Sequence, residues 1–179
     1  MNHYAGPDLA RAFRTVRKNT LEIARDIPAE QYGARPADGM MTVAEMLAHL
    51  AAYSGWQIAA HRDEKLTVIS LEDFPRLIGA ANAYAATLKT KADIVNALER
   101  DGETLAGWFA SLTDATLAET VGFPPPLQPA TKTRFEMLMG IKEHEMHHRA
   151  QLMVVQRQLG MVPHLTRQRQ ERAAARAKR

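Results

Sequence analysis

This sequence of 179 residues predicts an all-α fold, a four-helix bundle with a long connection between its second and third helices. Four segments repeat apolar residues at intervals of three and four, the spacing of one buried helix face. No segment shows the apolar and polar alternation that is typical of a strand. The second and third helical segments are separated by residues 63–89, whereas neighbouring antiparallel helices need only about two to eight residues. A crossover of this length lets the two helices run in the same direction.

The first helix is predicted over residues 8–26. Its apolar positions lie three and four residues apart, and several basic residues, Arg17 among them, fall outside this stripe. Pro28 ends the helix, because proline has no amide hydrogen to donate and restricts the residue before it. We therefore expect the helix to end at about Asp26.

The second helix is predicted over residues 42–62. Thr42 can cap its first turn through the side-chain oxygen, and Glu45, three residues later, can reach back to the amide of Thr42. One of its apolar stripes contains His49 and therefore places this histidine at the edge of the core. In the connection that follows, a short helix is expected around residues 71–78.

The third helix is predicted over residues 90–111 and the fourth over residues 131–159. Between them, residues 113–130 contain three consecutive prolines, so we expect an extended surface loop. Gly160 is a suitable C-terminal cap for the fourth helix, and Pro163 prevents its continuation. The sequence thus predicts one bundle domain over residues 1–163 and a basic tail over residues 164–179.

Composition excludes several classes of protein. With 46% hydrophobic and 24% charged residues, the chain is typical of a globular domain that buries a substantial core. It contains no cysteine, which excludes disulfides, iron–sulfur clusters and zinc sites built from thiolates. Any metal site must therefore use histidine, aspartate or glutamate.

The charge distribution argues against a nucleic-acid partner. The formal net charge is +3, but residues 164–179 carry +5, which leaves −2 for residues 1–163. The body of the protein is therefore not a basic surface. The chain also has neither an apolar run of membrane length nor a stretch resembling a signal peptide. We expect a cytoplasmic protein that binds neither nucleic acid nor membrane.

Three of the seven histidines, His144, His147 and His148, fall within five consecutive residues of the fourth predicted helix. Residues four apart lie on the same face of a helix, so His144 and His148 can point at one spot. A buried imidazole without a partner is costly. The two side chains therefore need either hydrogen-bonding neighbours or a metal ion, for which they supply half of a site.

His49 is the best candidate for a third ligand, because it lies near the core on a different long helix, and bundles build metal sites from facing helices. The other histidines fit less well: His3 is close to the N-terminus, His61 is turned about 120° from His49, at 100° per residue, and His164 lies beyond the end of the fourth helix. A structural, hydrogen-bonded histidine cluster and other ligand sets are the alternatives.

Five further residues are candidates for a role beside the histidines. Glu45 and Glu145 are weak candidates for a general base or for a partner of a metal ligand. The alternative interpretations are a helix-capping role for Glu45 and a solvated flank for Glu145. Tyr53, Trp56 and Gln151 are candidates to line a pocket, and the plainer interpretation of the first two is as aromatic residues of the core.

Residues 144–148 also match the H-E-x-x-H pattern of zinc proteases. In such enzymes the helix usually lies beside a sheet, and the third ligand follows downstream. Here no strand pattern precedes the motif, and only His164 and Glu171 follow it as possible ligands. A peptidase is therefore the weaker interpretation.

One histidine, His49, lies within Met46-Leu47-Ala48-His49-Leu50, and a late His144-x-x-x-His148 is followed by Arg-Ala-Gln-Leu. With these two motifs in this order, the sequence resembles the DinB family of metal-dependent enzymes. The resemblance extends over residues 8–162. It implies a four-helix bundle, a divalent metal held by three histidines and frequent homodimers. Members of the family differ in activity: some transfer low-molecular-weight thiols, and many are hydrolase-like. The basic tail is not part of the family pattern, and we expect it to be a solvated or frayed extension.

Three neutral imidazoles leave coordination positions open on a metal, which is typical of a catalytic site. Bound water would have a lowered pKa and act as a nucleophile in a hydrolase, whereas a bound thiol would be held as the thiolate in a thiol S-transferase. Zinc and nickel both suit such ligands. The sequence therefore predicts a metal-dependent enzyme acting on a small molecule. The alternative is a non-catalytic, metal-stabilised dimeric binding or sensor bundle.

Overall fold

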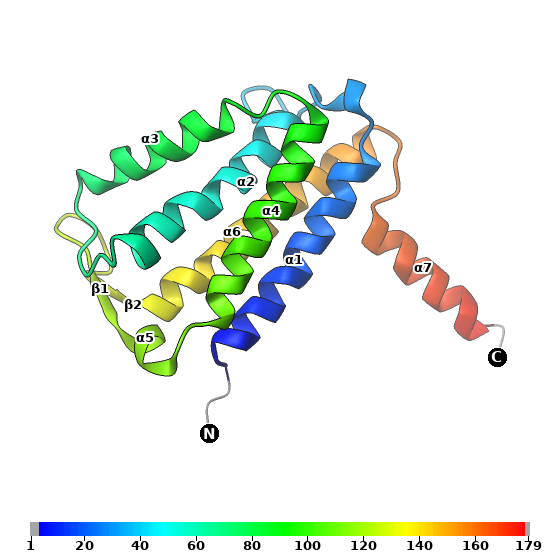
Figure 1. Cartoon of the computed structure of the whole chain (residues 1–179). Helices are drawn as coiled ribbons and strands as arrows, with labels where there is room; N and C mark the ends of the chain where they lie inside the picture. Colours follow the sequence, from blue (N-terminus) through cyan, green and yellow to red (C-terminus); the bar gives the residue numbers. More distant parts are fainter. Residues whose placement is uncertain (1–3, 178–179) are drawn as a thin grey trace.

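The computed structural model describes residues 4–177, and it is all-α, as predicted. Four long helices form the bundle (Figure 1): α1 (Gly6–Asp26), α2 (Val43–Ile58), α4 (Lys91–Ala110) and α6 (Arg134–Gln158). Helices α1 and α6 run in one direction, and α2 and α4 run in the other (Figure 1). The expectation that the long connection joins two parallel helices is therefore confirmed.

Threonine caps fix where three of these helices begin. Thr42 with Glu45 caps α2, as predicted, and Thr90 with Asp93 caps α4 in the same way. In each pair the threonine oxygen accepts from the backbone amide of the acid, and the carboxylate accepts from the amide of the threonine. Helix α6 begins three residues later than predicted, because its capping box starts at Thr133.

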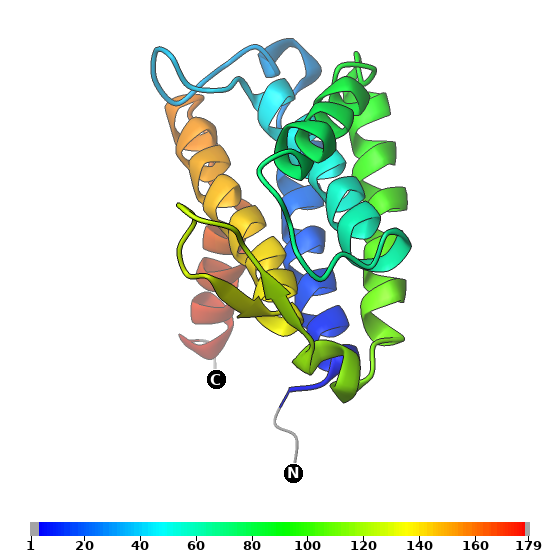
Figure 2. The same cartoon turned by 90° about the vertical axis from the view of Figure 1, so that its left-hand side faces the viewer.

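The prediction that the chain contains no strand was wrong. Strand β1 (Thr120–Gly122) pairs antiparallel with β2 (Thr131–Thr133), and the short helix α5 (Asp114–Ala118) precedes them. Strands of three residues are too short to show an alternating pattern, and only Val121 among them is buried. Figure 2 shows this hairpin crossing the end of the bundle at which α6 begins.

The crossover contains one helix, α3 (Asp73–Ala85), which is longer than the predicted segment 71–78. It lies along α2, outside the four-helix bundle (Figures 1 and 2). Leu77 is its only buried residue. Two polar contacts assist it: Arg76 pairs with Glu64, and the Tyr84 hydroxyl donates to Asp101 on α4 at 2.6 Å. Because α3 is thinly packed, a cleft is left between it and α2.

The most buried face of α6 lies to one side of His144. Its most buried side chains include Leu138, Ile141, Glu145 and Leu152, whereas His144 lies half-buried at the edge of this stripe. The interpretation of Glu145 as a solvated flank was wrong. Its carboxylate accepts hydrogen bonds from the guanidinium of Arg17, with N···O distances of 2.9 to 3.0 Å. Arg17, which lies outside the apolar stripe of α1 in the sequence, is buried as well.

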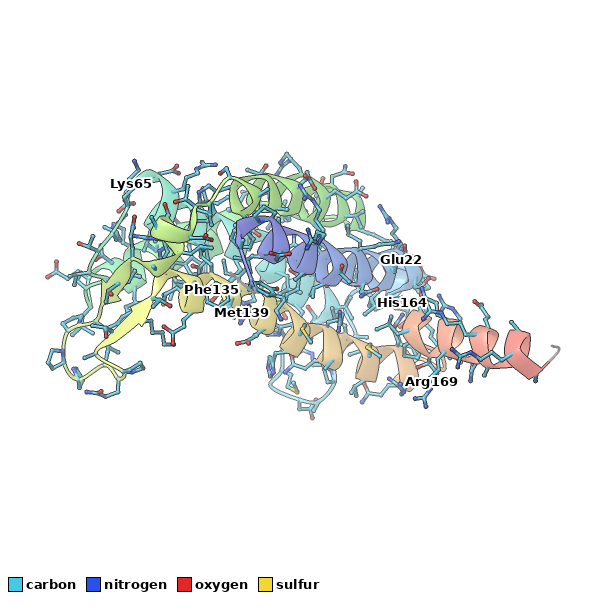
Figure 3. All side chains as sticks on the ribbon, turned by 90° about the horizontal axis from the view of Figure 1, so that it is seen from below. Glu22, Lys65, Phe135, Met139, His164 and Arg169 are labelled. Carbon is cyan, nitrogen blue, oxygen red and sulfur yellow. The ribbon has the colours of Figure 1, made fainter. Side chains whose placement is uncertain are left out.

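Residues 164–177 form a further helix, α7 (His164–Ala177), which projects away from the bundle (Figures 1 and 3). Most of it is exposed, as expected, but it is helical rather than frayed. Its first turn also contacts α1: His164 is buried and lies 3.1 Å from Asn19, and Arg167 pairs with Asp26. The domain boundary at residue 163 stays a prediction. Within the described part of the chain, no helix combines the length and apolarity needed to cross a membrane.

Candidate metal centre

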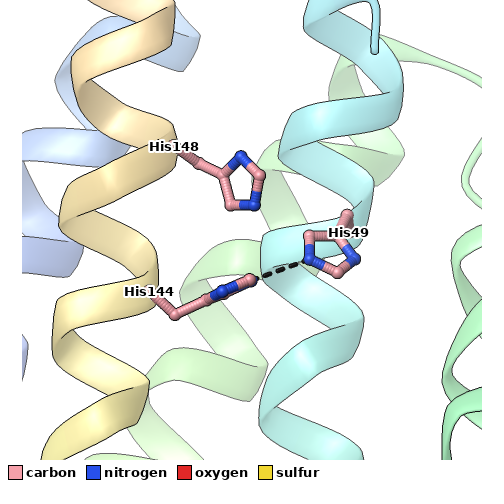
Figure 4. Close-up of side chains that lie close together, drawn as sticks. All are labelled: His49, His144 and His148. Atoms are coloured by element: carbon pink, nitrogen blue, oxygen red, sulfur yellow. Dashed lines mark hydrogen bonds between the residues drawn. The ribbon is translucent and has the colours of Figure 1, made fainter. Parts of the chain in front are cut away.

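Three histidines from two facing helices meet at one point, as the sequence predicted. His49 comes from α2, and His144 and His148 come from successive turns of α6, with their rings turned toward one another (Figure 4). One nitrogen from each ring lies within 4.8 Å of the other two. His49 Nε2 and His144 Nε2 are 2.8 Å apart and share a hydrogen bond. This is the group that we expected to hold a metal.

The nitrogen positions fit a small divalent ion. Zinc bound to histidine has Zn–N bonds of about 2.0–2.1 Å, and tetrahedral geometry then places the nitrogens about 3.3 Å apart. His49 Nε2 and His144 Nε2, 2.8 Å apart, are closer than this, and the three ligand nitrogens all lie within 4.8 Å of one another, so the rings would turn to accept an ion. An ion there would replace the single proton that now joins the two rings. The donor set, three imidazoles without a carboxylate, suits zinc or nickel.

Gln151 fixes the orientation of one of the three rings. The Nδ1 of His148 lies 2.8 Å from Oε1 of Gln151, one turn further along α6. Since an amide oxygen can only accept, Nδ1 of His148 carries the proton, and its Nε2 keeps a free lone pair. The amide nitrogen of Gln151 in turn donates to Nε2 of His147 at 3.2 Å. Metal-binding histidines commonly have such a partner on the second ring nitrogen.

The surroundings keep all three imidazoles neutral. Burial, followed by the proximity of His148 and His49, lowers the pKa of His144 to about 4. Burial also lowers the pKa of His49, with a smaller contribution from His148. For His148, burial again lowers the pKa, and the hydrogen bond to Gln151 partly opposes it. Neutral imidazole is the form that ligates a metal, so the trio is in its binding form at neutral pH.

Aromatic residues of α2 connect the trio with the cleft beside α3. The ring of Tyr53 stacks on that of His144, with centroids 4.1 Å apart and an interplanar angle of 17°. Trp56 packs edge-on against Tyr53 at 5.6 Å. Tyr53, Trp56 and His49 all line a cleft of about 270 Å³ between α2 and α3. The two aromatic residues are therefore both packed side chains and pocket walls.

Neither glutamate candidate is placed to act as a base at the trio. Glu45 is exposed and caps α2, and the hydrogen bonds from Thr42 lower the pKa of its carboxyl. Both carboxylate oxygens of Glu145 accept from Arg17 inside the bundle. The capping interpretation of Glu45 is confirmed.

The remaining histidines lie elsewhere. His147 is exposed on the flank of α6, where its ring packs edge-on against that of His148 and its Nε2 accepts from Gln151, but it is not one of the three converging rings. His61 is buried in a π-helical turn after α2, with Nδ1 2.8 Å from Arg134, and burial, followed by the charge of Arg134, lowers its pKa to about 4. His164 contacts Asn19 near the start of α7. His3 lies outside the described residues.

Sequence reasoning missed the wall of the cleft that α3 provides. Phe74, Ile78, Ala81 and Asn82 line it opposite His49. The first three follow the four- and three-residue spacing of one helix face, which was the available signal. The predicted helix ended at residue 78, so it did not include Ala81, and the sequence did not indicate which helix it would pack against.

Comparison with known families agrees with the resemblance noted in the sequence. The family model of the DinB superfamily matches residues 12–152. This region contains all three histidines of the trio and most of the four bundle helices. A comparison with curated protein sequences finds no match.

Proposed function

The chain belongs to the DinB superfamily, and from this membership and the histidine geometry we propose that it is a metal-dependent enzyme acting on a small molecule. The observation that carries the proposal is the convergence of His49, His144 and His148 beside an open cleft. Three protein ligands leave at least one coordination position for water or substrate. A metal that served only to stabilise the fold would more commonly have four protein ligands.

The residues around the trio have definite tasks in this proposal. His49, His144 and His148 would hold a divalent ion, with zinc or nickel the best-suited metals. Such an ion supplies Lewis acidity, which lowers the pKa of a bound water or thiol. Gln151 holds the proton on the outer nitrogen of His148. Tyr53, stacked on His144, restricts the motion of that ring and shields one side of the site.

Metal content tests the proposal directly. Purified protein should contain about one divalent ion per chain, measured by elemental analysis. His49→Ala, His144→Ala and His148→Ala should each release most of it, because each removes one of only three ligands. His147→Ala is the matched control and should retain the ion, since its ring lies outside the trio. A wild-type protein that neither contains nor takes up zinc, nickel or manganese would refute the metal site.

A thiol S-transferase requires an added thiol for activity, whereas a hydrolase does not. A transferase should bind a low-molecular-weight thiol, such as glutathione or bacillithiol, at the metal and conjugate it to an electrophile such as monochlorobimane. A hydrolase should cleave an ester, amide or lactam without any thiol. Cobalt-substituted protein reports thiol binding through its visible spectrum. If no thiol perturbs that spectrum and a broad hydrolase panel is silent, the non-catalytic binding or sensor bundle becomes the better interpretation.

We further propose that the protein forms a homodimer. The resemblance to the DinB family implies it, and the exposed apolar side chains of Met146 and Val154 on α6 support it, being 40% and 47% exposed. Light scattering at micromolar concentration should give about twice the chain mass of 19.9 kDa. A mass of one chain would contradict the proposal.

A further inference from the structure

We propose that the cleft between α2 and α3 binds an uncharged, apolar group of the substrate, of the size of one aromatic ring with a short chain. The inference rests on the proposed function, because it concerns the substrate of the same three-histidine site. In this proposal α3, the helix outside the bundle, selects the substrate.

The cleft and the histidine trio share two side chains. His49 belongs to the trio and also lines the cleft, and Tyr53 lines the cleft while stacking on His144. A molecule seated in the cleft therefore has one end beside the point where the three rings converge. The opposite wall is built by Phe74, Ile78 and Ala81 of α3.

The chemistry of the walls excludes charged groups. Among the described residues that line the cleft, none is acidic, lysine or arginine, and the side chain of Asn82 is the one amide. A carboxylate or ammonium group entering here would lose hydration without gaining an ionic partner, which is strongly unfavourable. The nearby charges of α3 are already engaged, since Arg76 pairs with both Glu64 and Asp73. Aromatic and aliphatic walls instead favour an apolar group.

The volume limits the size of that group. A cavity of about 150 Å³ with apolar walls accepts a benzene molecule, and drug-sized ligands occupy sites of about 300–1,000 Å³. The cleft measures about 270 Å³, which lies between these values. It has room for one ring and a short chain, and its uncharged walls do not suit a charged thiol such as glutathione. In a thiol transfer the cleft would therefore hold the electrophile rather than the thiol.

Metal-binding probes that differ only in their side group test the inference. With cobalt-loaded protein, benzohydroxamic acid should bind at least about tenfold more tightly than acetohydroxamic acid, and 4-carboxybenzohydroxamic acid should lose most of that advantage. Binding is read from the visible spectrum of cobalt. Equal affinities for the three probes, in protein that retains its metal, would overturn the inference and leave the metal site standing.

Variants of α3 separate the cleft from the metal. Ala81→Trp should fill the cleft and abolish the preference for benzohydroxamic acid, with metal content and acetohydroxamic acid binding unchanged. Ala83→Trp, at an exposed position of the same helix, is the matched control and should behave as wild type. Ile78→Lys should reverse the charge preference in favour of the 4-carboxy probe, and its partly exposed position tolerates the change. If Ala81→Trp keeps the wild-type preference, the ring binds elsewhere.

A second measurement needs no metal, so that the inference is tested even if the metal site fails. Because Trp56 lines the cleft, benzamide should change the tryptophan fluorescence of metal-free protein at millimolar concentration, whereas benzoate should not. Trp56→Phe should remove the response, and Trp108→Phe, on α4, should keep it. An equal response to benzamide and benzoate, or none to either, would refute the uncharged-ligand inference.

Discussion

Gln151 was predicted to line a pocket, but the residues that line the cleft beside α3 do not include it, and its contacts are with two histidines. One amide group serves two histidines, accepting from Nδ1 of His148 and donating to Nε2 of His147. An amide can do this because it carries both an acceptor and donors. The consequence is that the nitrogen of His148 that faces the trio is the unprotonated one, before any metal arrives.

Replacing Gln151 should therefore weaken metal binding without removing a ligand. Gln151→Leu keeps the size but loses the acceptor, and we expect a loss of about 10–100-fold in metal affinity, the usual effect of removing such a partner. Competition with a chromophoric chelator measures it. Gln151→Glu should preserve most of the affinity, because a carboxylate still accepts from Nδ1. An unchanged affinity in Gln151→Leu would show that the hydrogen bond does not orient His148.

At the scale of the elements, Arg17 of α1 joins all four helices of the bundle. It pairs with Glu145 of α6 and also donates to the backbone oxygens of Leu98 in α4 and Leu50 in α2, at 2.8 and 3.2 Å. Gly102 makes room for it, since a Cβ atom there would lie 2.9 Å from its guanidinium. Because Glu145 is adjacent to His144, this ion pair helps to fix the rotation of α6 that presents His144 and His148 to α2.

Breaking this ion pair on one side should be costly. Glu145→Ala leaves a buried guanidinium without its anion, and we expect the free energy of unfolding to fall by about 3–5 kcal/mol. Replacing both partners, as in Arg17→Met with Glu145→Leu, should restore most of the loss, because no buried charge remains. Urea denaturation measures both variants.

An exposed pair between two of the same helices provides the control. Arg14 of α1 pairs with Glu103 of α4 at the surface, and Glu103→Ala should cost less than about 1 kcal/mol. If Glu145→Ala destabilises the protein no more than Glu103→Ala does, the buried pair does not hold the bundle together.

At the scale of the whole molecule, charge and position separate the tail from the bundle. Helix α7 carries most of the basic surplus and projects from the end of α6 (Figure 3). Its attachment is confined to the first turn, where His164 is buried and Arg167 meets Asp26. Over its described residues, 164–177, the tail has no hydrogen bond or ion pair with the histidine trio, which lies between α2 and α6 (Figure 4).

Two truncations should distinguish the attached turn from the projecting helix. A chain ending at Arg169 should match the full-length protein in thermal stability and metal content. A chain ending at Pro163 loses the buried contact of His164 and should be less stable by about 1 kcal/mol, a drop of about 2–4 °C in Tm for a protein of this size. Its metal content should not change. Calorimetry measures the stability of both chains. A large loss of stability in the chain that ends at Arg169 would mean that α7 packs on the bundle along its length.

Local spacing in the sequence was sufficient to predict the four bundle helices and half of the site. Thr42 with Glu45 marks a helix start by itself, because both hydrogen bonds of a capping box lie within four residues. His144 and His148 share a face in any α-helix, whatever surrounds it. These features depend on neighbours in the chain, so no knowledge of the tertiary structure was needed.

Only the tertiary structure decided which polar side chains are buried and what lies opposite them. Arg17 and Glu145 each fall outside the apolar stripe expected for their helix, so a periodic pattern assigns both to solvent, although each supplies the partner that makes the other's burial tolerable. His49 and His144 are 95 residues apart in the sequence, and they meet only because α2 and α6 are rotated so that these side chains face each other. The cleft likewise exists only because α3 returns along α2. Contacts between distant segments arise from packing, and no local spacing encodes them.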